Sequence, residues 1–372
     1  IGHCGINNTG RGNLIEKNVI SNSMLLLNDG AAIKSYGHNS KYSEWRNNFV
    51  FNVPGSREGT DGMRNELKAH GLYLDEYCSN NSLLNNTITG ASSSAINLYN
   101  GCKENLIEDN VCYSNEFGIR FYQGDELMTG NQILNNIFFG LNSDQQAVCY
   151  RAGSEDFRPA IFKDNYYANP GTDDIYLYQT MTRKTFYNLS EWNSFMGNNN
   201  SESAKLLLQS EVKFSKLFCN MSDDILTIPL YPNITYKDLN MNIQQGSVTI
   251  PPWSSVILLT NADITNLPEI NIAGGPLVFN TIEENVNLNF NQWYSVIGKN
   301  LSEPLAINAP DGFEISFDSD GNFSKSMTVN PDGGKINKII FVKFIKEEYK
   351  DYDNFISNQS GTVNAIIKVK AD

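Results

Sequence analysis

The feature that most constrains the fold of this chain is a motif, Asn-x-apolar-x-x-Asn-x-apolar, that recurs through the first 170 residues. Clear copies are NLIEKNVI (13–20), NSLLNNTI (81–88), NLIEDNVC (105–112) and NQILNNIF (131–138), and looser copies are SEWRNNFV (43–50) and AIFKDNYY (160–167). The second asparagines, Asn18, Asn48, Asn86, Asn110, Asn136 and Asn165, are separated by 30, 38, 24, 26 and 29 residues. Such periods are typical of stacked repeats, so we expect a solenoid rather than a closed globule.

Apolar and polar residues alternate in a second kind of segment, which lies between these copies. Its examples are GAAIKSY (30–36), GLYLDEY (71–77), SAINLYN (94–100), GIRFYQG (118–124) and AVCYRAG (147–153). Alternation with a period of two predicts strands. Two or three short strands per coil, with small residues at the corners and an asparagine at a turn, predict a parallel β-helix with coils about 4.8 Å apart. Stacked asparagine side chains can bond to one another and to the turn backbone, which explains their recurrence.

In these features residues 1–170 resemble the right-handed parallel β-helix proteins, the architecture of pectate-lyase-like and related carbohydrate-active proteins. The repeat then stops, and we expect residues 171–263 to form a connecting segment and a small antiparallel β-sandwich, with helical spacing at EWNSFMG (191–197). The segments LSEW (189–192) and PPWSSVILL (251–259) resemble the C-terminal β-sandwich of secreted β-helix and glycosidase-type proteins of Bacteroidetes-like bacteria.

Residues 264–372 carry regular strand and turn signals, among them QWYSVIGKNL (292–301) and GTVNAIIKVK (361–370). About seven short strands in ~100 residues are typical of an Ig-like sandwich. This stretch resembles Ig-like repeats in secreted and surface proteins of bacteria that use the type IX export route, which implies a spacer or a cell-surface anchor. We therefore expect an all-β chain, with a right-handed parallel β-helix, a small antiparallel β-domain and an Ig-like β-sandwich, that is secreted or attached to a bacterial surface.

Composition narrows the range of partners. The net charge is −13 and no basic run stands out, so we expect no nucleic-acid partner. No apolar run approaches the roughly 18 residues of a membrane span. The six cysteines are too widely spaced for a CxxC metal pair, so we expect no metal and no other cofactor; the thiols are either free and buried or form disulfides between neighbouring coils. Because IGHCGINNTGRGN (1–13) already follows the repeat, we expect further coils before Ile1.

Aligning the coils on their asparagines predicts which side chains of the alternating strands point outward. Residues such as Leu72 and Leu74 point into the coil, and the residues between them point out. Tyrosine rings suit the apolar face of a sugar, and planar polar groups suit its hydroxyls, so we predict a glycan or polysaccharide partner on this face, with plain solvated surface as the alternative. The predicted substrate-binding residues are Tyr73, Asn97, Tyr99, Arg120, Tyr122, Arg151, Lys34 and His70. His70 follows the longest insertion, a charged loop at 53–69, and such insertions gather on the binding face of a solenoid.

Hydrolysis of a glycosidic bond needs two carboxyl groups that flank it. We predict Asp75 as one of them, with Glu76 or Glu126 as its partner and Asp125 in the same insertion as Glu126. The segments DGAAI (29–33) and GLYLDE (71–76) resemble the DGGAI and GIYLDD of secreted bacterial β-helix proteins often grouped with glycoside hydrolases. This resemblance implies a glycoside hydrolase that acts on a polysaccharide.

Two alternatives remain open. A polysaccharide lyase or epimerase would neutralise a uronate with Arg120, Arg151 or Lys34 and remove a proton with a tyrosine or His70. A non-catalytic protein would only hold a glycan on the same face, as a binding or adhesive surface protein. We favour an enzyme but leave the question open at this point.

Overall fold

The structure is a computed structural model, and it describes residues 2–58, 66–151, 159–169, 172, 174, 176–179, 183–196, 205–207, 212–279, 291–345 and 352–371. The chain divides into two compact units, one of Ile1–Asn220 and Ile225–Ala262 and the other of Met221–Asp224 and Asp263–Asp372. Strands make up nearly all of the regular structure in the described residues, which confirms the all-β class.

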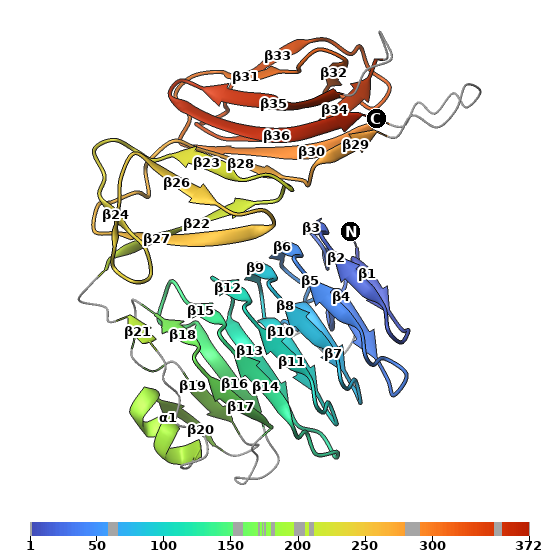
Figure 1. Ribbon diagram of the computed structural model, residues 1–372, viewed down its shortest axis with the longest axis vertical. Helices are drawn as coiled ribbons and strands as arrows, with labels where there is room; N and C mark the ends of the chain where they lie inside the picture. Colours follow the sequence, from blue (N-terminus) through green and yellow to red (C-terminus); the bar gives the residue numbers. More distant parts are fainter. Residues whose placement is uncertain are drawn as a thin grey trace. The chain divides into compact units, whose positions relative to one another are not determined.

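Successive coils of the first unit build three sheets, called A, B and C here (Figure 1). Sheet A contains β1 (Ile6–Asn8), β4 (Gly30–Tyr36), β7 (Ala69–Asp75), β10 (Ser94–Tyr99), β13 (Phe117–Tyr122), β16 (Gln146–Arg151), β19 (Tyr176–Gln179) and β20 (Lys184–Tyr187). Sheet B contains β2 (Leu14–Glu16), β5 (Glu44–Arg46), β8 (Ser82–Leu84), β11 (Leu106–Glu108), β14 (Asn131–Leu134) and β17 (Ala160–Lys163). Sheet C contains β3 (Val19–Ser21), β6 (Phe49–Val53), β9 (Thr87–Ala91), β12 (Val111–Tyr113), β15 (Ile137–Phe139), β18 (Tyr166–Ala168) and β21 (Lys205–Leu207). Neighbouring strands pair in parallel except β19 with β20, so the predicted parallel β-helix is confirmed.

An asparagine ladder links the coils at the turn between sheets B and C. Nδ2 of Asn86 donates to Oδ1 of Asn110 at 2.9 Å, and Nδ2 of Asn110 donates to Oδ1 of Asn136 at 2.9 Å. Asn110 also donates to the carbonyl of Leu83 at 2.8 Å. These amides are buried, and a buried amide is tolerated only when it is hydrogen-bonded. Each coil therefore supplies a partner for the asparagine of the next, which confirms the predicted role of the motif.

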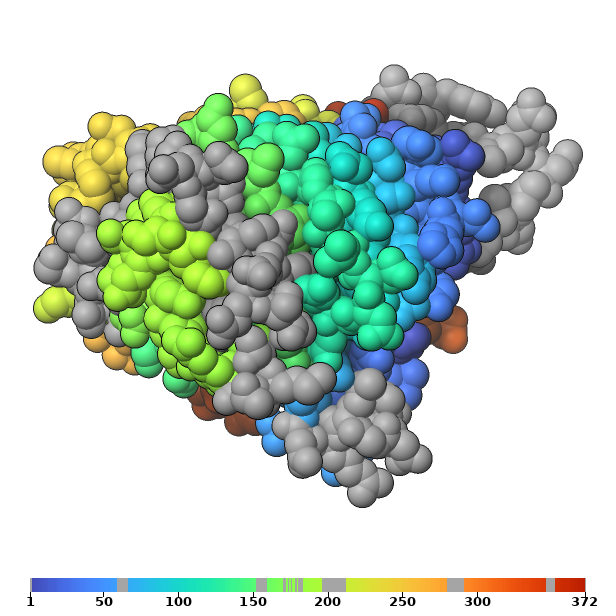
Figure 2. All heavy atoms as spheres, turned by 90° about the horizontal axis from the view of Figure 1, so that it is seen from below, coloured from blue at the N-terminus to red at the C-terminus, as the bar shows by residue number. Residues whose placement is uncertain are grey.

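A short helix, α1 (Leu189–Met196), covers the last coil (Figures 1 and 2). It begins at a capping box, because the backbone N–H of Glu191 donates to Oδ1 of Asn188 and the backbone N–H of Asn188 donates to Oε2 of Glu191. The buried ring of Trp192 stacks on Tyr176 at a centroid distance of 4.5 Å and on Tyr150 at 4.9 Å. The helical spacing in the sequence thus belongs to an element that closes the hydrophobic interior.

The small antiparallel β-domain packs on the outer side of sheet C. Its strands are β22 (Phe214–Asn220), β23 (Leu226–Pro229), β24 (Tyr236–Lys237), β25 (Ile243–Gln244), β26 (Ser247–Ile250) and β27 (Ser254–Thr260). The hydroxyl of Tyr113 donates to the carbonyl of Ser215 at 3.0 Å, and Oγ1 of Thr87 lies 2.8 Å from Oγ of Ser255. These contacts cover part of sheet C and do not involve sheet A.

The second unit contains two sheets whose strands are antiparallel except where β29 pairs with β36. One sheet contains β28 (Glu269–Ala273), β30 (Gln292–Lys299), β34 (Ile336–Phe344) and β32 (Phe313–Ser316). The other contains β29 (Leu277–Phe279), β36 (Val363–Ala371), β35 (Tyr352–Ser360), β31 (Leu305–Asn308) and β33 (Ser326–Val329). In its core the hydroxyl of Tyr294 donates to Oδ1 of Asn358 at 3.0 Å. Among the described residues of the whole chain, no helix is both long and apolar enough to cross a membrane.

Candidate functional site

Two columns of side chains run across the outward side of sheet A, as the sequence predicts. The middle column consists of Lys34, Tyr73, Asn97, Arg120 and Cys149, which pair in register on successive coils. The edge column, at the ends of the same strands, consists of Tyr36, Asp75, Tyr99, Tyr122 and Arg151. Leu72 and Leu74, on either side of Tyr73 in the strand, are completely buried in the interior, so the predicted register is confirmed.

The two columns differ in accessibility. Tyr73, Asn97 and Arg120 of the middle column are only 3–5% exposed. Tyr36 of the edge column is 53% exposed, Tyr99 and Tyr122 are partly exposed, and Asp75 is 8% exposed. A ligand on this face would therefore meet the edge column first, with the middle column supporting it from below.

Asp75 is held by two neighbours from the middle column. Its Oδ2 lies 2.9 Å from Nζ of Lys34 on the preceding coil. Burial raises the pKa of Tyr73 well above its ordinary value of 10.0, and the nearby charge of Asp75 and a hydrogen bond between the two side chains add to the increase. Tyr73 is therefore a neutral phenol beside the Asp75 side chain, which is paired with Lys34.

Glu76 follows Asp75 in the chain, and its side chain lies against Tyr36. Its Oε2 accepts a hydrogen bond from the hydroxyl of Tyr36 at 3.2 Å, and its backbone N–H donates to Oδ1 of Asp75 at 3.0 Å. The charge of Glu76 is the largest cause of the raised pKa of Tyr36, and Asp75 contributes to it. Burial raises the pKa of Tyr99, again with contributions from both carboxylates. The two carboxylates therefore lie beside Tyr36 at the exposed edge of sheet A.

Glu126 occupies a different place, in the turn after sheet A. Its backbone N–H donates to Oδ1 of Asn100 at 2.8 Å, and a Cβ atom added to Gly101 would lie 3.2 Å from its Cβ. No contact among the described residues joins Glu126 to Asp75. Of the predicted carboxylates, the structure thus brings together Asp75 and Glu76.

His70 is buried beside the middle column. Its Nδ1 lies 2.7 Å from Oγ of Ser94, and its ring contacts the edge of the Tyr73 ring at a centroid distance of 4.9 Å. Burial lowers the pKa of His70 well below its ordinary value of 6.5, and the positive charges of Arg120 and the lysines nearby lower it further. The imidazole is therefore neutral at neutral pH.

Glu66 is a residue of this face that sequence reasoning missed. It belongs to the long insertion before β7, of which residues 59–65 lie outside the described part of the chain. Its Oε1 lies 3.4 Å from Nη2 of Arg120 and 3.2 Å from Nη1 of Arg151. Both guanidinium groups also lie over the ring of Tyr122, at 5.3 Å and 4.6 Å from its centroid. The charge of the insertion was the available signal, but it did not single out Glu66.

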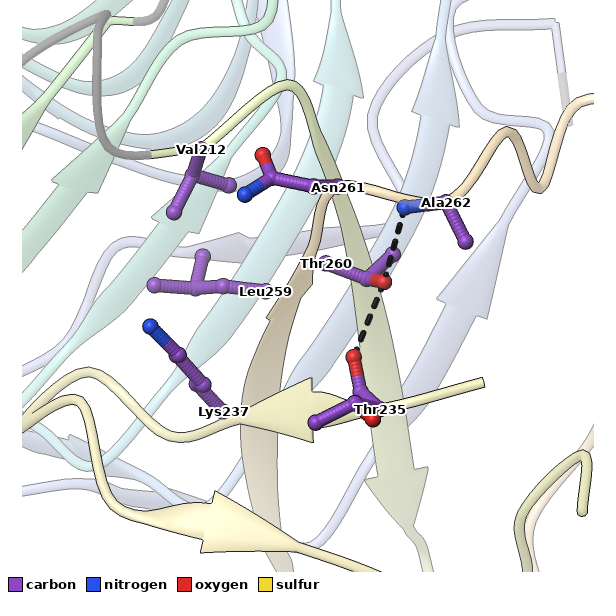
Figure 3. Close-up of a pocket in the computed structure, with 7 residues that line it drawn as sticks. All are labelled: Val212, Thr235, Lys237, Leu259, Thr260, Asn261 and Ala262. Carbon is purple, nitrogen blue, oxygen red and sulfur yellow. Dashed lines mark hydrogen bonds between the residues drawn. The ribbon is translucent and has the colours of Figure 1, made fainter. Parts of the chain in front are cut away.

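Other features lie apart from this face. All six cysteines are free thiols. Within the described residues, no three His, Cys, Asp or Glu side chains gather as a metal ion would require. A pocket of about 290 Å³ lies at the small β-domain, where Oγ1 of Thr260 donates to the carbonyl of Thr235 (Figure 3). None of the residues that line this pocket belongs to sheet A.

A comparison with protein families gives a match for the coils of the first unit. Residues 1–156 match the family model described as the right-handed beta helix region, which spans the coils from β1 to β16. No curated protein matches the chain. The match supports the fold and its handedness over these coils.

Proposed function

We propose that this protein is a carbohydrate-active enzyme that binds a polysaccharide along the edge column of sheet A and cleaves it by hydrolysis. Right-handed β-helices are common among carbohydrate-active proteins, and the first 156 residues are similar to that family. The observation that carries the proposal is the position of Asp75 and Glu76 at the exposed edge column, where Asp75 pairs in register with Tyr36 and Oε2 of Glu76 accepts a hydrogen bond from the Tyr36 hydroxyl at 3.2 Å.

Each group of the strip has a role in this proposal. The rings of Tyr99 and Tyr122, whose centroids are 5.0 Å apart and whose planes are tilted by 56°, would contact the apolar face of a sugar. Asp75, paired with Lys34, acts as the ionised base or nucleophile, and Glu76 donates the proton to the leaving oxygen. The separation of the two carboxyl groups in the complex would decide between retention and inversion at the anomeric carbon.

A screen of neutral and acidic polysaccharides tests this function, with reducing ends and near-ultraviolet absorbance recorded together. Hydrolysis creates new reducing ends without absorbance, and the anomeric configuration of the first product reports the stereochemistry. The appearance of an unsaturated, absorbing product would contradict hydrolysis. Binding of a polysaccharide without any product would reduce the function to a glycan-binding or adhesive protein.

Cleavage by β-elimination is the second candidate, and a separate observation favours it. A lyase or epimerase needs a neutral base next to a cation that neutralises a uronate. The pKa of His70 is lowered by burial and by the positive charge of Arg120, and a neutral imidazole with such a cation would suit this chemistry. Both residues are almost fully buried, so elimination would require the face to open around them.

The location and partners of the protein are part of the same proposal. We propose a bacterial protein that is secreted or held at the cell surface, with the Ig-like sandwich as spacer or anchor. Fractionation of the source cells, with antibody detection of intact cells, would test this location. Detection only inside the cell would contradict it.

A further inference from the structure

The two arginines on sheet A hold a carboxylate that belongs to the protein itself. Arg151 Nη1 lies 3.2 Å from Oε1 and 3.3 Å from Oε2 of Glu66, and Arg120 Nη2 lies 3.4 Å from Oε1. The three groups come from distant parts of the chain, since Glu66 precedes β7 while the arginines belong to β13 and β16. Convergence of two guanidinium groups on one carboxylate is the arrangement that proteins use to bind carboxylate, sulfate and phosphate groups.

Glu66 is a loosely bound occupant of this position. Strong charge-assisted hydrogen bonds between guanidinium and carboxylate are about 2.7–2.9 Å long, and all three contacts of Glu66 are longer. Its side chain is 44% exposed, so water competes for the same carboxylate. A ligand carboxylate of better geometry could therefore replace it at small cost.

Arg120 is also not fully satisfied by this occupant. Nη1 of Arg120 donates to Oγ of Ser93 at 3.2 Å, but its buried Nε has no hydrogen-bond partner among the described residues. Asn97, on the preceding coil, pairs in register with Arg120, and its buried Oδ1 also has no hydrogen-bond partner among the described residues. Unpaired buried polar atoms are costly, so this part of sheet A is not fully satisfied by the protein's own groups.

The balance of charge around the pair also favours an anion. Burial raises the pKa of the Cys149 thiol to about 12, and the charged groups that act on it are Arg120, Arg151, Lys184 and Glu116. Together with Glu66, these groups make up three cations (Arg120, Arg151 and Lys184) and two carboxylates (Glu116 and Glu66). These five groups therefore carry one more positive than negative charge.

We propose that Arg120 and Arg151 form an anion subsite for an acidic sugar of the bound polysaccharide, and that Glu66 occupies it as an internal stand-in until the sugar's carboxylate replaces it. This inference rests on the proposed binding of a glycan to sheet A. It adds that the glycan carries a carboxylate, and that Glu66 competes with it. Arg151 lies three coils from Asp75, about 14 Å at ~4.8 Å per coil, so the acidic sugar would lie beside the sugars at the cleavage point.

The test compares uronate oligosaccharides with their own methyl esters, which keep the skeleton and lose the charge. The probes are trimers of galacturonate, glucuronate and mannuronate, and the readout is the dissociation constant from calorimetry. Wild-type protein should bind one acid form about 10-fold more tightly than its ester, and salt should reduce that preference. Glu66→Gln should tighten binding of the acid form by about 10-fold and leave the ester unchanged. Arg151→Gln should abolish the preference while the ester still binds.

A matched control and three adverse outcomes make the test decisive. Glu58→Gln alters an exposed carboxylate of the same insertion and should leave all constants unchanged. Equal binding of acid and ester by wild type would overturn the anion subsite and leave the proposed function intact. Weaker binding of both forms by folded Glu66→Gln would also overturn it, because Glu66 would then support the site rather than compete for it. Failure of every oligosaccharide and polysaccharide to bind would instead refute the proposed function.

Discussion

The ammonium nitrogen of Lys34 lies 2.9 Å from Oδ2 of Asp75, although 41 residues of sequence separate the two side chains. They lie on adjacent coils, where Lys34 pairs with Tyr73 and Tyr36 pairs with Asp75. The ion pair is possible only because the coils stack in a fixed register, so the fold itself creates the electrostatic setting of Asp75.

Replacing one member of this pair should show how much the two groups stabilise each other. Both side chains are mostly buried, so Lys34→Met should lower the free energy of unfolding of the first unit by about 1–2 kcal/mol. Asp75→Asn should also destabilise it, and the double variant should lose less than the sum of the two. Urea denaturation of the four proteins measures this coupling. Simple additivity would mean that the pair contributes nothing to stability.

The asparagine ladder should be most sensitive to change at its centre. Asn110→Ala removes partners from Asn86 and Asn136 and leaves buried carbonyls unpaired, so we expect a loss of about 3–5 kcal/mol in the free energy of unfolding. Asn18→Ala at the end of the ladder is the control, because its side chain donates to Asn48 and to the carbonyl of Glu16 and is only partly buried. Equal losses at both positions, measured by denaturation, would show that stacking of the amides is not what stabilises the coils.

The buried His70 should make stability depend on pH in a defined direction. Its pKa in the folded protein is far below the ordinary value of 6.5, so below that pH the unfolded chain binds a proton that the folded chain does not. The contribution is fully present above pH 6.5 and is lost as the pH falls from there toward the folded pKa. Thermal melting between about pH 5 and 7.5 should show a steeper acid loss for wild type than for His70→Gln. His38→Gln serves as the control and should keep the wild-type profile.

Much of the fold and part of the site follow from periodicity. Once the asparagines set the register, the period of two places Tyr73, Asp75, Tyr99 and Arg120 on one face, because side chains alternate along a strand. A regular solenoid converts spacing in sequence directly into position in space. This is why the columns could be predicted without any structure.

Features that depend on irregular segments could not be predicted in this way. Glu66 reaches Arg151 from an insertion that breaks the repeat, and its position depends on the path of that loop. Tyr113 and Phe139 lie on the outer side of sheet C, and the small β-domain packs over them. Their unusual apolar character on an outer face was the available signal. The segment around Trp192 likewise has helical spacing, but nothing in its sequence indicates that Trp192 covers the end of the hydrophobic interior.

The most direct test of the central claim is turnover by Asp75→Asn on whichever polysaccharide the screen identifies. The account predicts a fall of about 100-fold or more in the rate of reducing-end formation, with polysaccharide binding retained, because the amide cannot act as base or nucleophile. Asp109→Asn is the matched control, since Asp109 lies in a turn at φ 56°, a conformation that asparagine accepts readily, and its turnover should equal that of wild type. Undiminished turnover by Asp75→Asn would contradict the assignment of catalysis to this face of sheet A.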